Sequence, residues 1–182
     1  MEEEKKIYGV YENSLLNKTI RLHIQEVGSQ IKQNLENKIN NICIGKCIPE
    51  GFIKPKSIKI LNYSSGMVDG EFINFSVNFE CKICNPVEGM NIECLVKNIT
   101  KAGISGESLN NDDGYNPINI FVARDHHYND NYFNNIKPNS KIVISVIGSR
   151  YELNDPFIVV LGKLKHEQKS DFVKSKPTIN IL

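Results

Sequence analysis

Long apolar segments and an excess of charge of either sign are both missing from this sequence of 182 residues. No apolar run approaches the ~20 residues that a membrane-spanning helix needs. The first residues, MEEEKK, are acidic, whereas a secretory signal begins with basic and then apolar residues. We therefore expect an intracellular protein that does not enter a membrane.

Charge is balanced along the chain, with a formal net charge of +1. Residues 1–80 hold ten basic and ten acidic side chains, and residues 81–165 hold nine of each. This balance excludes a polycation that binds nucleic acid through its total charge. Any contact with nucleic acid has to come from a local patch, because nonspecific affinity grows with the number of phosphates neutralised.

Cysteine occurs in an odd number, and alanine is scarce. The number of cysteines is odd, and in a chain without an export signal it predicts reduced thiols rather than a disulfide framework. They are Cys43, Cys47, Cys81, Cys84 and Cys94. Ala102 and Ala123 are the two alanines, whereas asparagine, isoleucine and lysine are abundant. We attribute this bias to an AT-rich genome, such as that of a large DNA virus or a protist.

The first half of the chain has the pattern of a small antiparallel sheet with one helix. Residues 5–11 and 18–24 alternate as strands do, and Ile20, Leu22 and Ile24 share one face. A helix is predicted over residues 28–42, followed by Gly45, which can end it. Its apolar positions at helical spacing are Ile31, Leu35, Ile39 and Ile42.

Three further strands and a loop are predicted after the helix. Residues 45–53 and 56–61 form short strands, and residues 62–71 form a loop in which Gly66 and Gly70 allow positive φ. The strongest strand signal lies in residues 72–83, because apolar side chains alternate through it without a break. On one face of it lie Phe75, Val77, Phe79, Cys81 and Ile83.

The second half predicts a closed five-stranded Greek-key barrel. Five short strands and one long gap, with a short helical turn in it and no sustained helical period, are typical of such barrels. The strands are residues 90–99, 102–108, 118–124, 141–148 and 156–164. The fold class is thus α+β for residues 1–84 and all-β for residues 85–165, followed by a tail over 166–182.

Two cysteine pairs offer a candidate zinc site, since thiolates at short spacing can fill two corners of a tetrahedron. The pairs are Cys43 with Cys47 and Cys81 with Cys84. Cys81 lies in the interior register of a strand, so Cys84 points to the opposite face unless the chain turns there. No glycine knuckle or nearby histidine accompanies either pair. We favour buried structural thiols.

Catalytic motifs are missing as well. His126 and His127 follow Asp125, with Asp112 and Asp113 one loop earlier, which leaves a metal-dependent hydrolase as a candidate. Adjacent histidines point apart on a strand, however, and the acidic pair is typical of a solvated loop. No HExxH helix, serine elbow, phosphate loop or dinucleotide fingerprint is present. We expect a chain without catalytic residues, bound metal or cofactor.

A binding surface remains the best-supported site. Five-stranded barrels of this kind bind single-stranded nucleic acid by stacking bases on aromatic rings and neutralising phosphates. Phe121 is predicted to point outward, because Ile118, Ile120 and Val122 form the apolar face of its strand. The candidate RNA-binding residues are Lys97, Lys101, Phe121, Arg124, His127 and Tyr128.

Several of these residues also carry a family resemblance. The second half of the chain resembles the RNA-binding OB domain first described in a large bacterial protein of the small ribosomal subunit. The resemblance lies in Gly89, Val96, Ile99, Gly103 and Ile104 and in the segments IFVARDHH and IKPNSKIVISVIG. That module is widespread, so it implies an RNA-binding barrel and no particular process.

The first half of the chain makes the resemblance specific to one protein family. This half resembles the stalk subunit of multisubunit DNA-dependent RNA polymerases in the order of its features. They are a helix, the residues GKC, a loop with Gly66 and Gly70, and the segment FSVNFECKICNPVEGM that leads into the barrel. This is the seventh-largest subunit of eukaryotic RNA polymerase II, which has a counterpart in archaea. The chain departs from the family at Cys94, where a glycine is common, at IPEG in place of KFG, and in a shorter loop from Gly66 to Gly70.

The resemblance implies a non-catalytic subunit with two ends. Residues 1–84 become a tip domain that docks on the polymerase core, and residues 85–165 become an OB barrel near nascent single-stranded RNA. It implies core subunits and a small companion stalk subunit as partners. It places the protein in the nucleus of a cell, or in the host cytoplasm or virion of a virus. The implied docking residues are Gly45, Gly66, Met67, Val68, Asp69 and Gly70.

A free-standing OB-fold factor for translation or RNA decay is the alternative. Such a factor needs the barrel but has no use for a docking domain, so the first half of the chain distinguishes the two hypotheses.

Overall fold

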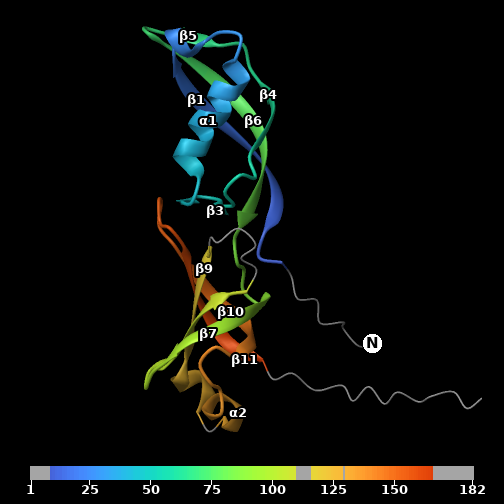
Figure 1. Cartoon of the computed structure of the whole chain (residues 1–182), viewed down its shortest axis with the longest axis vertical. Coiled ribbons are helices and arrows are strands. Elements are labelled where there is room, and N and C mark those ends of the chain that lie inside the picture. The colour runs from blue at the N-terminus through green and yellow to red at the C-terminus, as the bar shows by residue number, and fades with distance from the viewer. Residues whose placement is uncertain (1–8, 110–115, 129, 166–182) are drawn as a thin grey trace, which may run out of the picture.

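A computed structural model describes residues 9–109, 116–128 and 130–165, which form two units stacked end to end (Figure 1). The first unit is a β-sheet with one helix, and the second is a closed barrel. The predicted strand at residues 5–11 falls mostly outside the described residues, as does the tail at 166–182. In the described part of the chain, no helix is long and apolar enough to cross a bilayer.

The first sheet is organised around one long strand, β6 (Phe72–Cys84). The strand β1 (Glu12–His23) pairs with it antiparallel over its full length, from Glu12 opposite Ile83 to His23 opposite Phe72. Four shorter strands complete the sheet, three of them paired with β6 and the fourth paired with β3. They are β2 (Cys47–Ile48), β3 (Gly51–Ile53), β4 (Lys59–Tyr63) and β5 (Met67–Asp69).

The alternation in β6 positions the core of this unit. All five residues predicted to share its inner face are buried, which confirms the period-two pattern. The helix α1 (Ile31–Cys43) covers that face, and Leu35, Ile39 and Cys43 are its buried residues. Gly45 follows with φ of 66°, the left-handed conformation that ends many helices.

Two apolar residues of the predicted faces lie outside this core. Ile42 is 48% exposed, because Cys43 occupies the last buried position of the helix. Ile24 is 52% exposed, because β1 ends at His23 and a 3₁₀ turn, η1 (Ile24–Glu26), begins there. The imidazole Nδ1 of His23 accepts a hydrogen bond from the Gln25 amide (3.2 Å), which caps this turn.

The predicted loop at residues 62–71 contains the strand β5, which corrects the sequence analysis. The three residues of β5 are all exposed, so they lack the alternation that would reveal a strand. Gly70 has φ of 62°, as predicted, but Gly66 does not have a positive φ. Gly66 is instead required by space, because a Cβ there would collide with Ile73 and would lie 2.8 Å from the Phe75 ring.

The second unit is a closed five-stranded barrel in the order β10-β11-β9-β8-β7, which confirms the predicted fold class. β9 and β11 pair in parallel, and the other neighbours pair antiparallel. The long gap after the third strand holds η2 (Arg124–His127) and a predicted helical turn, α2 (Asn131–Asn134). The strands are β7 (Asn91–Ile99), β8 (Gly103–Ser108), β9 (Ile118–Ala123), β10 (Lys141–Arg150) and β11 (Ile158–Lys165).

The two units share a hydrophobic core at their junction. Val10, Cys47, Phe52 and Cys84 of the first unit belong to the same buried cluster as the barrel interior. Backbone hydrogen bonds cross the junction as well: the Cys47 amide donates to the Asp155 carbonyl (2.8 Å), and the Cys47 carbonyl accepts from Asn154 (2.9 Å). The Tyr151 hydroxyl also donates to the Pro49 carbonyl (2.9 Å). The units are therefore packed together rather than linked by a free segment.

Candidate nucleic-acid interface

The five thiols are buried and free, and they divide between the two cores. Cys43 and Cys81 lie in the core under α1, whereas Cys47, Cys84 and Cys94 lie in the core of the barrel and junction. Each pair that is close in sequence is thus split between two cores. Among the described residues, no group of three or more histidine, cysteine, aspartate or glutamate side chains could hold a metal ion.

The bend between β7 and β8 forms one edge of the barrel's far end, away from the first unit (Figure 1). The Thr100 amide and hydroxyl both donate to the Gly103 carbonyl, at 2.8 and 3.0 Å, which closes the bend tightly. Lys101 is exposed within it. The bend therefore presents its lysine from a fixed backbone.

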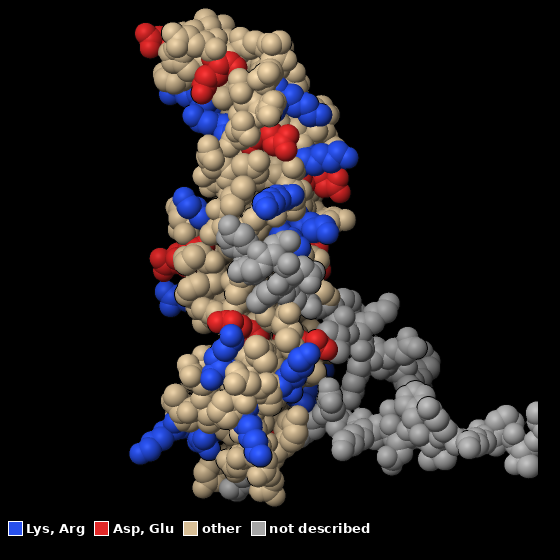
Figure 2. Space-filling model, in the orientation of Figure 1, with Lys and Arg blue, Asp and Glu red and all other residues tan. Residues whose placement is uncertain are grey.

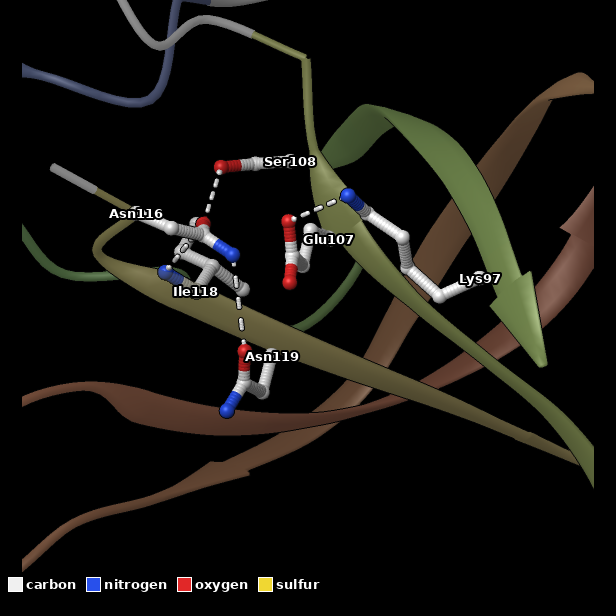
Figure 3. Close-up of polar contacts among 6 residues, drawn as sticks. All are labelled: Lys97, Glu107, Ser108, Asn116, Ile118 and Asn119. Carbon is white, nitrogen blue, oxygen red and sulfur yellow. Dashed lines mark hydrogen bonds and ion pairs between the residues drawn. The ribbon is translucent and has the colours of Figure 1, made fainter. Parts of the chain in front are cut away.

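Lys97 lies on the outer wall next to this bend and is held by a carboxylate. Its Nζ lies 3.2 Å from an Oε of Glu107 on the neighbouring strand β8 (Figure 3). The two side chains are 43% and 37% exposed, so solvent screens the pair. Glu107 thus neutralises part of the positive charge of Lys97, which was predicted to bind phosphate.

Phe121 faces away from the barrel interior, as the period of β9 predicts. Ile120 and Val122 on either side of it are buried, whereas Phe121 is half-buried. Its ring lies beside Gly103, where a Cβ would come within 3.0 Å of it. One edge of the ring is therefore covered by the β8 backbone, and the remainder belongs to the outer wall.

Arg124 joins the bend to the short helix α2. Its guanidinium donates to the Lys101 carbonyl (3.0 Å), the Thr100 carbonyl (3.4 Å) and the Asn134 side-chain oxygen (3.1 Å). It also lies over the Phe133 ring, with 5.1 Å between its Cζ and the ring centroid. Arg124 is thus engaged by the protein itself, which the sequence alone does not reveal.

His127 has a structural position, although the sequence made it a candidate RNA ligand. It is 7% exposed and stacks on Phe133, with ring centroids 5.0 Å apart. Its Nε2 accepts from the Leu164 amide (2.9 Å), so Nδ1 carries the proton and donates to the Ala123 carbonyl (2.8 Å). Both ring nitrogens are therefore occupied by backbone groups. Tyr128, the next residue, is 86% exposed.

A polar network below the outer wall was not anticipated from the sequence. The Asn116 side-chain oxygen accepts from the Ser108 hydroxyl and the Ile118 amide, both at 3.2 Å, and its nitrogen donates to Asn119 (3.4 Å) (Figure 3). Ser108 is 2% exposed, so this bond satisfies a buried hydroxyl. The network links the end of β8 to the start of β9.

The candidate docking residues fall at two places on the first unit. Gly66 to Gly70 surround β5 at the end farthest from the barrel (Figure 1). Met67 and Val68 are 75% and 73% exposed there, and Asp69 pairs with Arg21 of β1 at 3.5 Å. Gly45 lies at the other end of the sheet, two residues before the junction residue Cys47. The structure therefore groups five of the six residues.

Comparison with known proteins identifies RNA polymerase subunits as relatives. No family model matches the chain. A protein of Acanthamoeba polyphaga mimivirus named as DNA-directed RNA polymerase subunit L376 is 28% identical over 186 residues, covering 91% of this chain and 86% of its own length. Subunit 7 of DNA-directed RNA polymerase II from Arabidopsis thaliana is 26% identical over 112 residues, which is 60% of each chain. These similarities confirm the resemblance to a stalk-type subunit.

Proposed function

We propose that this chain is a non-catalytic stalk subunit of a DNA-dependent RNA polymerase. It docks on the polymerase core through the tip domain and contacts nascent single-stranded RNA through the OB barrel. The observation that carries the proposal is the extent of the similarity to the mimivirus subunit: at 91% of the chain, it includes both units and not the widespread barrel alone.

The tip domain supplies a docking surface in this proposal. Met67 and Val68 expose apolar side chains on β5, beside the ion pair between Arg21 and Asp69. Apolar side chains with a polar rim are typical of protein interfaces. Because β5 pairs with β6, this surface is held by the sheet and does not need to order on binding.

The barrel supplies a weak RNA-binding surface. Exposed lysines and aromatic rings lie at its far end, but Lys97 is partly neutralised and the net charge of the chain is +1. Weak affinity suits a subunit held beside emerging RNA, because attachment gives the RNA a high effective concentration. We expect the free protein to bind single-stranded RNA with a salt slope of about 0.7 per neutralised phosphate.

A pull-down with the tagged chain, followed by mass spectrometry, tests this proposal. We expect recovery of polymerase core subunits, together with a small companion subunit if the stalk has two members. The matched variant is Met67→Asp with Val68→Asp, which places charge on the docking surface and should lose the polymerase. Recovery of ribosomes or nucleases in place of polymerase would overturn the proposal and favour the free-standing RNA-binding factor.

A further inference from the structure

A pocket of about 240 Å³ opens at the far end of the barrel, between α2 and the start of β10. Tyr132 and Ile136 give it an aromatic and an aliphatic side, and Lys137 and Lys141 contribute two exposed cations. Asn135 and Ser140 add an amide and a hydroxyl. None of these residues belongs to the RNA-binding set derived from the sequence.

The turn at residues 137–140, which lines the pocket, is attached to the barrel by short hydrogen bonds. The Ser140 hydroxyl donates to the Lys137 carbonyl (2.7 Å), which closes the turn between the two lysines. The Asn139 amide donates to the Val96 carbonyl (2.8 Å), and the Val96 amide donates to the Ser140 carbonyl (2.9 Å). These bonds tie the turn to β7, so its backbone is fixed before any ligand arrives.

The charge of the pocket is positive. None of its lining residues is a carboxylate. Lys141 lies opposite Leu95 on β7 and so has no acidic partner directly across the ladder, in contrast to the ion-paired Lys97. On the face shown in Figure 2, the lowest Lys and Arg side chains of the molecule have no Asp or Glu next to them, whereas acidic side chains adjoin those slightly higher. An anionic ligand therefore fits this pocket best.

Shape and chemistry restrict the ligand further. The volume falls just below the ~300 Å³ at which pockets for drug-sized ligands begin, so it suits one small group. An aromatic and an aliphatic side chain favour a flat ring, and two cations at the same site favour phosphate. We propose that this pocket binds one unpaired nucleotide of single-stranded RNA, with the base against Tyr132 and the phosphate on Lys137 and Lys141. The inference rests on the proposed function, which brings RNA to this barrel.

The position of the pocket extends the proposed RNA surface. Arg124 bonds both to the β7–β8 bend and to Asn134, the last residue of α2. The bend and the pocket are therefore joined through one side chain at the same end of the barrel. In this proposal, an RNA strand that passes the bend places its next base in the pocket.

The test uses the full chain and a labelled single-stranded RNA of about 12 nucleotides, within the ~4–16 that an OB fold covers. Binding is measured by fluorescence anisotropy over a range of salt concentrations. Two variants remove the proposed contacts: Lys137→Gln with Lys141→Gln, and Tyr132→Ala. Two others serve as controls: Tyr132→Phe, which keeps the ring, and Lys59→Gln with Lys82→Gln, which removes two exposed lysines from the tip sheet.

We expect the double lysine variant to lower the salt slope by about 0.7, because both lysines contact the one phosphate of the bound nucleotide. Tyr132→Ala should weaken binding at least about fivefold, whereas Tyr132→Phe, which keeps the ring, should weaken it less. RNA binding that is unchanged in both pocket variants would overturn the pocket and leave the proposed RNA contact standing. Absence of RNA binding by the unmodified chain would overturn both.

Amide shifts of the ¹⁵N-labelled chain identify the group that is bound. Uridine and adenosine monophosphates should move the signals of Asn135 to Ile142 further than inorganic phosphate does. Equal shifts from phosphate alone would show an anion site and refute the base contact. The double lysine variant should still recover polymerase in the pull-down, because its substitutions lie outside the docking surface. Failure of the unmodified chain to recover polymerase would contradict the docking proposal and would leave the pocket proposal to the RNA-binding test.

Discussion

Gly103 stands where a side chain would meet the neighbouring strand. A Cβ built at this position overlaps the carbonyl oxygen of Val122 and lies 3.0 Å from the Phe121 ring. Gly103→Val should therefore force β8 and β9 apart and lower the free energy of unfolding by about 2 kcal/mol, within the range for overpacked sites. Urea denaturation measures this loss.

Gly148→Ala is the control for that substitution. Gly148 lies in β10, its φ is not positive, and nothing lies within 4 Å of the added Cβ. We expect a change in stability well below that of Gly103→Val. Equal stability of Gly103→Val and the unmodified chain would mean that the approach of β8 to β9 is looser than the structure describes.

Glu107 is expected to restrain RNA binding through its ion pair with Lys97. Glu107→Gln removes the charge but keeps the shape, so it frees the Lys97 ammonium for phosphate. Because exposed pairs contribute up to about 1 kcal/mol, RNA affinity should rise by about two- to fivefold, and the salt slope should become steeper. The control is Glu152→Gln, which breaks an exposed ion pair with Arg150 (3.4 Å) near the junction. Equal gains from both variants would show a general charge effect.

The sequence predicted the orientation of one candidate residue, Phe121, and did not reveal the burial of another, His127. Phe121 was placed outward because period two needs no tertiary information. The burial of His127 depends on the Leu164 amide, 37 residues away, and on stacking with Phe133, so local sequence could not predict it. Lys137 and Lys141 frame a pocket that exists only once the turn between them is tied to β7.

At the level of elements, the strands β6 and β7 carry three of the buried thiols. Burial raises the pKa of Cys84 and Cys94 to about 12, and that of Cys81 to about 11, from 9.0. The folded state therefore favours the protonated thiol. This contribution to stability is fully present below pH 9, where thiols of the unfolded chain are also protonated, and it is lost as pH rises from 9 toward 12.

We expect the free energy of unfolding to fall as pH rises above 9. Denaturant titrations on either side of pH 9 measure the fall. Cys94→Ala serves as the control, because it removes one buried thiol and should make the dependence on pH shallower while other groups titrate as before. A slope that is the same in Cys94→Ala would show that Cys94 does not contribute to it.

Elements with a buried face were predicted well, and an exposed element was not. The period of β6 gave its five core residues, and the barrel strands followed from the same alternation. β5 escaped prediction because all three of its residues are exposed, and its pairing with β6 is set by the turn at Gly70. Its position is a property of the sheet and not of its own sequence.

For the whole molecule, the shared core predicts that tip and barrel unfold together. Phe52 is 1% exposed and lies between the strands that carry Cys47 and Cys84, within the barrel's own cluster. Phe52→Ala should cost about 3–5 kcal/mol and should separate the transitions of the two units. Amide signals from each unit, followed through a urea titration, report the two transitions independently.

Phe133→Ala is the matched control. Phe133 is 3% exposed in the same cluster, but it belongs to α2 at the far end of the barrel. We expect a similar loss of stability without separation of the two transitions. Two distinct transitions in the unmodified chain would show that the junction does not couple the units.

Because β6 is long, a small rotation at one end of the strand produces a large displacement at its other end. Its 13 residues extend ~43 Å at ~3.3 Å per residue, from the β5 end of the sheet into the junction. A rotation of about five degrees at the anchored end would carry the other end through ~4 Å over this strand alone. A small tilt of whatever holds the tip would thus reach the barrel as a displacement comparable to the spacing between stacked bases.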